Sequence, residues 1–217
     1  MAPAPAGSHR EQKRDRTKAA ILDAAIDLFE SRGYDETTIA DIAAAAGIAP
    51  RTFFSYFASK DELVFDGAEN QVDAAAAAIA QRQPGDSTTE VLLRGLTGVI
   101  DGGHDYLDRH NELRFRLIQS VPAVRGRALQ IQVDAQREIA RRLHDAYSEE
   151  LDHITAGAMV GAYVGAVTGA IQAMHDTGAP ADPQTRSAVL RQAVEAALQP
   201  WATPSTARSS TARDAKA

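Results

Sequence analysis

The sequence predicts an all-α fold of about nine helices. Apolar residues recur at the i, i+3, i+4 spacing of a helix along almost the whole chain, and no window alternates convincingly as a half-buried strand does. Breakers such as Pro84-Gly85 and Pro122 divide this pattern into helix-sized segments. The chain of 217 residues is 44% hydrophobic and 24% charged, which is ordinary for a soluble globular protein.

Composition excludes several classes of function. The chain has no cysteine, so disulfides, thiolate metal sites and a cysteine nucleophile are impossible. No two histidines lie four residues apart on a helix, and neither an H-E-x-x-H metal motif nor a G-x-S-x-G nucleophile motif occurs. We therefore expect that the protein has no metal site and no cofactor and is not an enzyme. The net charge is -6, but the first 18 residues are basic and the acidity belongs to residues 61–217.

Local patterns in the sequence begin and end each predicted helix. Ile21, Ala24, Ala25 and Leu28 share one apolar face of the first helix, which Gly33 ends. Two glycines at 102–103 are expected to kink or divide the helix that contains them. Proline, glycine and small polar residues at 1–10 and 202–217 predict flexible tails. The predicted helices span residues 11–31, 38–45, 49–56, 60–81, 88–109, 111–119, 123–147, 151–176 and 184–199.

The helix at 151–176 allows two interpretations. Residues 154–174 contain no charge over 21 positions, which is long enough to cross a membrane. However, the segment is rich in Ala and Gly, has no Leu or Phe, and lacks flanking Lys or Arg anchors. Gly157, Gly161, Gly165 and Gly169 recur every four residues and make a stripe that another helix can approach closely. We favour a packed helix over a membrane span.

Residues 33–63 predict a helix-turn-helix. Thr37 or Thr38 can cap a short helix, and Ala43 is small enough for two helices to cross. Gly47 then permits the reversal of the chain, and a second short helix follows. Ser59 can cap the next helix, whose first turn is acidic.

Three motifs resemble the DNA-binding domain of the TetR family of bacterial transcriptional regulators. They are A-x-x-L-F-x-x-x-G-Y at 25–34, T-T-I-x-x-I-A-x-x-A-G-I at 37–48 and T-F-F-x-Y-F-x-S-K-x-E-L at 52–63. The resemblance implies a DNA-binding domain at 11–75, with its reading unit at 38–57, followed by a helical ligand-binding and dimerisation domain at 76–201. It covers a little over a quarter of the chain and does not identify the ligand.

The second helix of a helix-turn-helix enters the major groove, so its exposed residues meet bases and phosphates. Arg51 is suited either to a bidentate contact with guanine or to a phosphate contact only. Phe54 stands where the family usually has a tyrosine, and Ala40 where some members have an arginine. Basic residues Arg10, Lys13, Arg14 and Arg16 in the N-terminal tail add attraction to phosphates. The candidate DNA-binding residues are Thr38, Ala49, Pro50, Arg51, Thr52, Ser55, Tyr56 and Lys60.

The remaining helices are assigned less specific roles. The resemblance implies that helices 151–176 and 184–199 pair with their copies in a homodimer; the alternative is that they close the protomer's own core. The candidate interface residues are Gly157, Gly161, Gly165, Gly169, Leu190, Val194 and Leu198. Candidate ligand-binding residues are Tyr106, His110, Arg114, Phe115, Ile118, Gln119, His144, Tyr147, Met159 and Tyr163. Arg114 and Arg116 would suit an anionic ligand such as an acyl-thioester or a carboxylate.

We therefore expect a cytoplasmic, homodimeric, ligand-responsive regulator that releases a palindromic operator when a small molecule binds. The expected partners are double-stranded DNA and an effector, with no membrane. The alternative is a helical small-molecule-binding or interaction protein that retains the scaffold but does not read DNA specifically. Exposed Arg51 and Lys60 favour DNA binding, whereas Phe54 and the acidic total favour the alternative.

Overall fold

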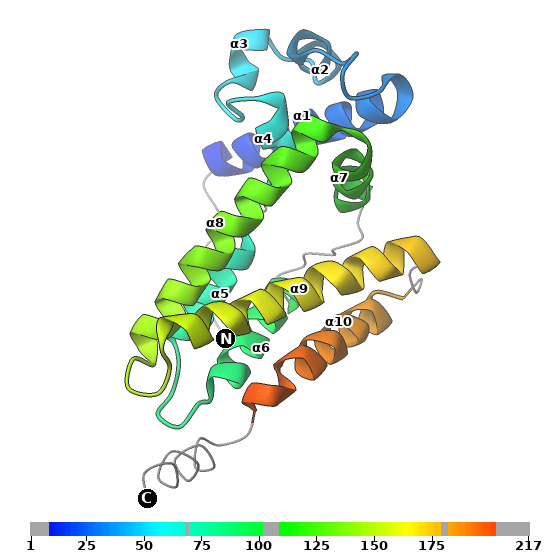
Figure 1. The fold of residues 1–217 in the computed structure, drawn as a ribbon. Helices are drawn as coiled ribbons and strands as arrows, with labels where there is room; N and C mark the ends of the chain where they lie inside the picture. The colour runs from blue at the N-terminus through cyan, green and yellow to red at the C-terminus, as the bar shows by residue number, and fades with distance from the viewer. Residues whose placement is uncertain (1–8, 68–69, 102–108, 179–181, 203–217) are drawn as a thin grey trace, which may run out of the picture. The chain divides into compact units, whose positions relative to one another are not determined.

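The computed structural model describes residues 9–67, 70–101, 109–178 and 182–202. Over these ranges it contains ten α-helices, one 3-10 helix and no strand (Figure 1), which confirms the all-α class with one helix more than expected. Residues 1–8 and 203–217, which hold most of the two predicted tails, lie outside the described ranges. The chain forms two compact units, which we call the N-terminal unit (9–66 and 109–129) and the C-terminal unit (the other described residues).

The N-terminal unit begins with α1 (His9–Arg32), α2 (Ile39–Ala45), α3 (Pro50–Phe53) and α4 (Lys60–Val64). The apolar face of α1 buries Ile21, Ala25 and Phe29, which lie four residues apart. The ring of Phe29 packs on that of Tyr34, with centroids 5.1 Å apart. Residues 9 and 10, expected in a tail, are already helical. This core anchors the short helices that follow.

One predicted helix, 60–81, is divided into two. The chain leaves α4 after Val64 and resumes as α5 (Asn70–Ala80), with Gly67 between them at φ +77°. A left-handed residue cannot continue a right-handed α-helix, and glycine adopts that conformation without a steric penalty. The apolar period runs on through the break, so periodicity alone did not reveal it. The predicted kink at 102–103 lies outside the described residues.

The N-terminal unit also contains α7 (Arg109–Ser120) and the start of α8 (Pro122–Ala146). Leu113 and Leu117 of α7 are buried. The Glu30 carboxylate on α1 accepts from Arg109 and from Arg116, each at 2.6 Å, so two ion pairs join the helices. From the sequence, α7 is expected in the domain that follows residue 75, and that domain boundary stays a prediction.

The C-terminal unit contains α5, α6 (Thr88–Asp101), the rest of α8, α9 (His153–Thr177), α10 (Pro183–Leu198) and the 3-10 turn η1 (Gln199–Trp201). α5 packs against α6, and α10 packs along both α9 and α6; Figure 1 shows α9 and α10 side by side. Asp152 and Asp182 cap α9 and α10 by accepting from the backbone N–H groups of Thr155 and Thr185. Its core is formed by Ala75, Ile79, Val91, Leu92, Leu96, Ile139, Leu143, Met159, Val160, Tyr163, Val167, Leu190, Val194 and Leu198.

α9 is long and apolar enough to cross a membrane by length and composition alone, which is weak evidence. A core helix of a soluble protein passes the same test. In this fold α10 packs along α9, and Met159, Val160 and Tyr163 are buried. These contacts fit the packed-helix interpretation.

Candidate nucleic-acid interface

The start of α2 is fixed by a reciprocal cap. The Thr38 hydroxyl accepts from the backbone N–H of Asp41 at 3.1 Å, and the Asp41 carboxylate accepts from the backbone N–H of Thr38 at 2.9 Å. The hydrogen bond that Thr38 donates holds the pKa of the Asp41 carboxyl below its ordinary value. This arrangement is a capping box, which is worth about 1 kcal/mol to a helix. Thr38 is therefore engaged in capping, although its side chain remains exposed.

The turn between α2 and α3 is closed by backbone hydrogen bonds. The N–H of Ile48 donates to the carbonyl of Ala43 at 2.9 Å, and that of Gly47 donates to the carbonyl of Ala44 at 3.1 Å. This pattern is a Schellman motif, which requires a left-handed residue after the helix. Gly47 supplies it with φ +67°. Ala43 is fully buried, as the crossing of the two helices requires.

α3 has one buried face and one exposed face. Phe53 and Phe57 are buried, with ring centroids 5.7 Å apart, and each contributes about 1.5–3 kcal/mol of burial. The predicted helix 49–56 is shorter, because after Phe53 the N–H groups of Ser55 and Tyr56 bond three residues back. The anchored aromatic face fixes which residues point outward.

Most of the candidate DNA-binding residues lie in α3 or directly beside it in the chain, whereas Thr38 caps α2 and Lys60 begins α4. Thr38, Ala49, Pro50, Arg51 and Ser55 are exposed, and Thr52, Tyr56 and Lys60 are half-buried. Phe54, which was not among the candidates, is the C-cap residue of α3 and is 57% exposed. The sequence carried a signal for this exposure: Phe53 and Phe57 are four residues apart and share one helix face, so Phe54 points away from that face.

Lys60 makes contacts that the sequence did not reveal. Its Nζ donates to the carbonyl of Tyr34 at 2.6 Å and to that of Thr37 at 3.0 Å, and lies 4.0 Å from the centroid of the Tyr34 ring. An ammonium has three donors, so these carbonyls occupy two of them. The Tyr34 hydroxyl donates to Asp61. Lys60 thus joins α4 to the α1–α2 loop, and its phosphate contact stays a prediction.

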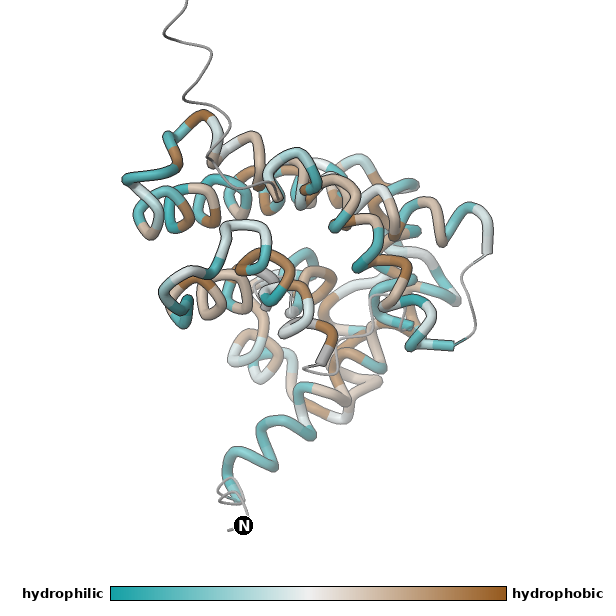
Figure 2. Tube along the Cα trace, turned by 90° about the horizontal axis from the view of Figure 1, so that it is seen from below, coloured by the Kyte–Doolittle hydropathy of each residue, from teal (hydrophilic) through white to brown (hydrophobic). Residues whose placement is uncertain are grey.

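The basic residues before residue 17 belong to a helix. Arg10, Lys13 and Arg14 lie at i, i+3 and i+4 on the exposed first turns of α1, whereas Arg16 lies on a different side. Figure 2 shows these first turns as a hydrophilic stretch. Lys13, Arg14 and Arg16 thus lie in the predicted helix, and Arg10, which was expected in the tail, is helical as well.

Residues 21–66, which span most of α1 through α4, match the sequence model described as bacterial regulatory proteins, tetR family. This segment of the chain is therefore similar to the DNA-binding region of the TetR family. The regulator TcmR of Streptomyces glaucescens is 28% identical over 148 residues, 66% of each chain. The repressor Rv3405c of Mycobacterium tuberculosis is 47% identical over 51 residues, 24% of this chain and 27% of its own. The chain thus covers two thirds or less of these curated relatives.

A solved TetR-family structure has the same fold. It is FadR of Thermus thermophilus, a transcriptional repressor in complex with lauroyl-CoA, which is 20% identical with a TM-score of 0.53. The alignment covers 84% of this chain and 91% of FadR. At this identity the likeness shows the fold and not the ligand.

The ten candidate ligand residues are distributed over both units. Tyr106 lies outside the described residues. His110, Arg114, Phe115, Ile118 and Gln119 belong to the N-terminal unit, whereas His144, Tyr147, Met159 and Tyr163 belong to the C-terminal unit.

The candidates in the N-terminal unit have partners within that unit. The His110 Nε2 lies 3.3 Å from the carbonyl oxygen of Leu63. Arg114 donates to Asn111. Arg116, named with Arg114 for an anionic ligand, instead pairs with Glu30.

The candidates in the C-terminal unit include buried polar groups. The Tyr147 hydroxyl donates to the carbonyl of Asp86 at 3.0 Å. Burial raises the pKa of the Tyr163 phenol to about 12. Met159 is fully buried, and its Sδ accepts from the Thr88 hydroxyl at 3.7 Å. These residues pack the unit, and a role in ligand binding stays a prediction.

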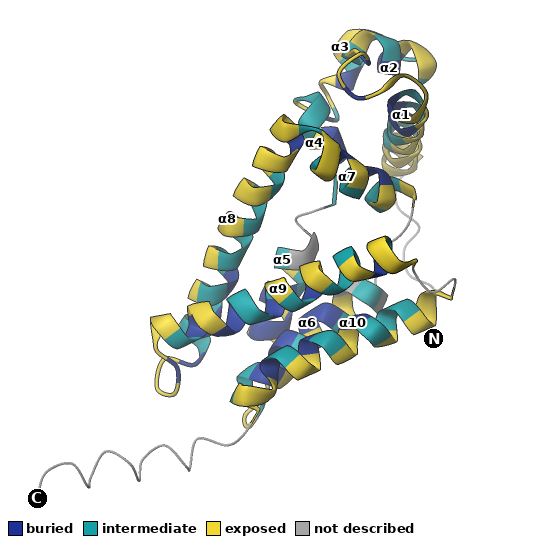
Figure 3. Cartoon of the chain, turned by 45° about the vertical axis from the view of Figure 1, so that its right-hand side comes forward, coloured by how far each residue is buried: buried dark blue, intermediate teal, exposed yellow. Residues whose placement is uncertain are grey.

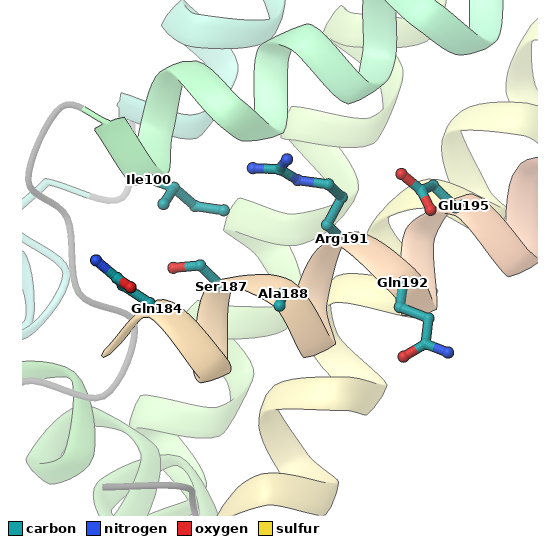
Figure 4. Close-up of a pocket in the computed structure, with 7 residues that line it drawn as sticks. All are labelled: Ile100, Gln184, Ser187, Ala188, Arg191, Gln192 and Glu195. Carbon is teal, nitrogen blue, oxygen red and sulfur yellow. The ribbon is translucent and has the colours of Figure 1, made fainter. Parts of the chain in front are cut away.

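A groove in the C-terminal unit lies elsewhere. It has a volume of about 430 Å³ and lies between α6 and α10. Ser187 and Arg191 project from α10 toward the side on which Ile100 of α6 lies, and Gln192 points away (Figure 4). None of the candidate ligand residues lines it. Its lining residues are Ile100, Gln184, Ser187, Ala188, Arg191, Gln192 and Glu195.

The candidate dimer residues separate into two groups. Gly157, Gly165 and Gly169 are exposed and Gly161 is half-buried, and a Cβ added at any of the four would meet no atom within 4 Å. Figure 3 shows that α9 has exposed stretches along its length. Leu190, Val194 and Leu198 are instead buried within the protomer. For these three residues the burial fits the alternative, because the apolar face of α10 packs against α9 and α6, and their place in a dimer interface stays a prediction.

Proposed function

We propose that this chain is a homodimeric, ligand-responsive transcriptional regulator, a repressor that binds an inverted-repeat operator. In this proposal α3 of each protomer enters the major groove of one half-site. A small molecule that binds the C-terminal domain then releases the operator. The protein acts in the cytoplasm, and its partners are double-stranded DNA, the effector and a second copy of the chain.

The exposed face of α3 carries this proposal. Phe53 and Phe57 bury the other face, and the Schellman turn at Gly47 fixes the angle between α2 and α3. Arg51 stands on the free face at the start of the helix, where a guanidinium can donate to O6 and N7 of guanine. Such a bidentate pair discriminates against a wrong base by about 1–3 kcal/mol.

The neighbouring residues suit contacts with the DNA backbone. Thr38, Thr52, Ser55 and Tyr56 carry hydroxyls at or beside the free face, and hydroxyls commonly bind phosphate oxygens. Arg10, Lys13 and Arg14 add positive charge that attracts DNA of any sequence. The net charge of -6 is therefore compatible with DNA binding, because the total does not describe how the charge is distributed and the start of the chain is basic.

Dimerisation supplies the second reading helix. One short helix binds weakly, whereas two related by a two-fold axis read half-sites about 34–36 Å apart. The open glycine stripe of α9 supports a homodimer, since bare backbone allows a symmetry-related helix to approach closely. Release by an effector requires only that the effector binds one arrangement of the two reading helices better than another. DNA must then weaken effector binding by the same factor.

Selection of bound sequences from random duplex DNA tests the proposal. We expect an inverted repeat, and sedimentation of the bound protein should give two protomers per repeat. Arg51→Ala should weaken operator binding by about 1–3 kcal/mol and weaken random DNA less. Arg14→Ala, a matched arginine remote from α3, should weaken both alike and reduce the salt dependence.

One result would reject the proposal and another would reject the role of Arg51. If the folded protein selects no DNA sequence, the alternative holds, a protein that does not read DNA specifically. If Arg51→Ala and Arg14→Ala cause equal losses of affinity on every probe, Arg51 does not read a base.

A further inference from the structure

Phe54 leaves a large apolar side chain exposed next to the proposed reading helix. It is the C-cap residue of α3, directly after Phe53, and is 57% exposed. Leu129, Val133 and Ile154 are also large and exposed, but they lie outside the helix-turn-helix. Because burial of apolar surface is favourable, an apolar group of a bound DNA would be stabilised against this ring.

The exposed ring of Phe54 contacts a buried ring. Phe53 is fully buried, and the two rings meet edge to face with centroids 5.6 Å apart and an interplanar angle of 83°. Edge-to-face pairs are a favourable aromatic geometry. This contact with the core favours the outward orientation that the Phe54 ring has in the structure.

The position of Phe54 relative to Arg51 indicates its partner. Arg51 lies in α3, and Phe54 is the C-cap residue of that helix with αR backbone. The two residues are three positions apart, so they lie on the same side of the helical turn. A phenyl ring has no hydrogen-bonding group and cannot bind a phosphate oxygen. In the major groove, the apolar feature of a base edge is the C5-methyl group of thymine.

We propose that Phe54 is a specificity-determining residue that contacts the C5-methyl of a thymine in each operator half-site. This inference rests on the proposed DNA-binding function and names one base that it reads. Removing one buried methyl from such a contact lowers affinity about fourfold. Removing both symmetry-related methyls from the inverted repeat should lower affinity by about 16-fold.

The experiment uses the selected operator and the full-length protein. In a set of duplexes each thymine is replaced, symmetrically in both half-sites, by deoxyuridine, which lacks only the C5-methyl. Affinities are measured for the wild type, for Phe54→Ala and for the matched control Ser55→Ala. Ser55 is the neighbouring exposed residue with a small polar side chain.

We expect one thymine position at which symmetric replacement by deoxyuridine lowers the affinity of the wild type about 16-fold. Phe54→Ala should bind the thymine and uracil duplexes at that position equally, and Ser55→Ala should keep the wild-type ratio. Circular dichroism verifies that both variants are folded. The wild-type uracil scan needs no variant, so it tests the inference even if Phe54→Ala fails to fold.

The inference is overturned if the wild type binds its operator but no uracil position changes affinity. It is also overturned if the half-site contains no thymine, or if Phe54→Ala keeps the wild-type ratio between the affinities for the thymine and uracil duplexes. In each of these outcomes the DNA-binding function stands. Failure to recover any operator would instead reject the proposed function itself.

Discussion

Lys60→Met tests whether the N-terminal unit depends on the ammonium that joins α4 to the α1–α2 loop. Methionine keeps most of the aliphatic stem but leaves the carbonyls of Tyr34 and Thr37 without their donor. A hydrogen bond to a charged group contributes about 1.5–3 kcal/mol. Because Lys60 is half-buried, we take about 2–3 kcal/mol for both bonds together.

The assay is thermal unfolding of the full chain followed by circular dichroism. For a chain of this length 1 kcal/mol shifts Tm by about 2–4 °C, so we expect the transition of the N-terminal unit to fall by roughly 5–10 °C. Lys18→Met is the matched control, since Lys18 makes a surface ion pair with Asp66 at 2.7 Å. Such pairs contribute about 0–1 kcal/mol.

The reasoning is refuted if Lys60→Met and Lys18→Met unfold at the same temperature. Operator affinity measured well below the transition gives a second readout. A large loss of affinity without a loss of stability would mean that Lys60 acts mainly on a phosphate. A loss of stability with little change in affinity at low temperature would mean that it acts mainly on the two carbonyls.

Two further predictions concern stability. Gly47→Ala should destabilise the chain by about 1–2 kcal/mol through left-handed strain alone, because the added methyl meets nothing within 4 Å. Gly126→Ala in α8 is equally open but helical, so it should stabilise the chain by about 0.5–1 kcal/mol. Urea unfolding compares the stabilities of the two variants, and equal effects would contradict the role of the left-handed backbone. Hydrogen bonds from Arg109 and then Arg116 lower the pKa of Glu30, so its contribution is complete above its ordinary pKa of 4.5 and is lost as pH falls through the lowered folded value. Glu30→Gln should therefore be about 0.5–1 kcal/mol less stable than wild type at pH 7, and this difference should shrink as pH falls below 4.5. A difference that stays constant as pH falls would show that the loss is not electrostatic.

The local elements could be predicted from the sequence because their causes are local. The apolar period of α1, the capping residue Thr38 and the left-handed Gly47 each act over a few residues, and the structure has them where the pattern indicated. Ser59 likewise caps α4 by accepting from the N–H of Glu62 at 3.0 Å. The helix-turn-helix is therefore readable from the sequence, and so is the exposure of Arg51.

The division of roles among the helices could not be predicted in the same way. An apolar face requires a partner, but its period does not say which one. The face of α10 with Leu190 and Val194 was compatible with a second protomer or with the protomer's own core, and the structure buries both residues within the protomer. The break at Gly67 was hidden by an apolar pattern that continues across it.

By itself, the sequence determined the all-α class, the capped helix-turn-helix and the outward position of Arg51, because each follows from backbone preferences within a single turn or helix. Only the tertiary structure decided what Lys60 and Glu30 contact. Lys60 reaches carbonyls 23 and 26 residues away, and Glu30 accepts from arginines 79 and 86 residues away. Such contacts are set by how helices pack, and a charged side chain carries no local signal of the partner that packing will bring to it.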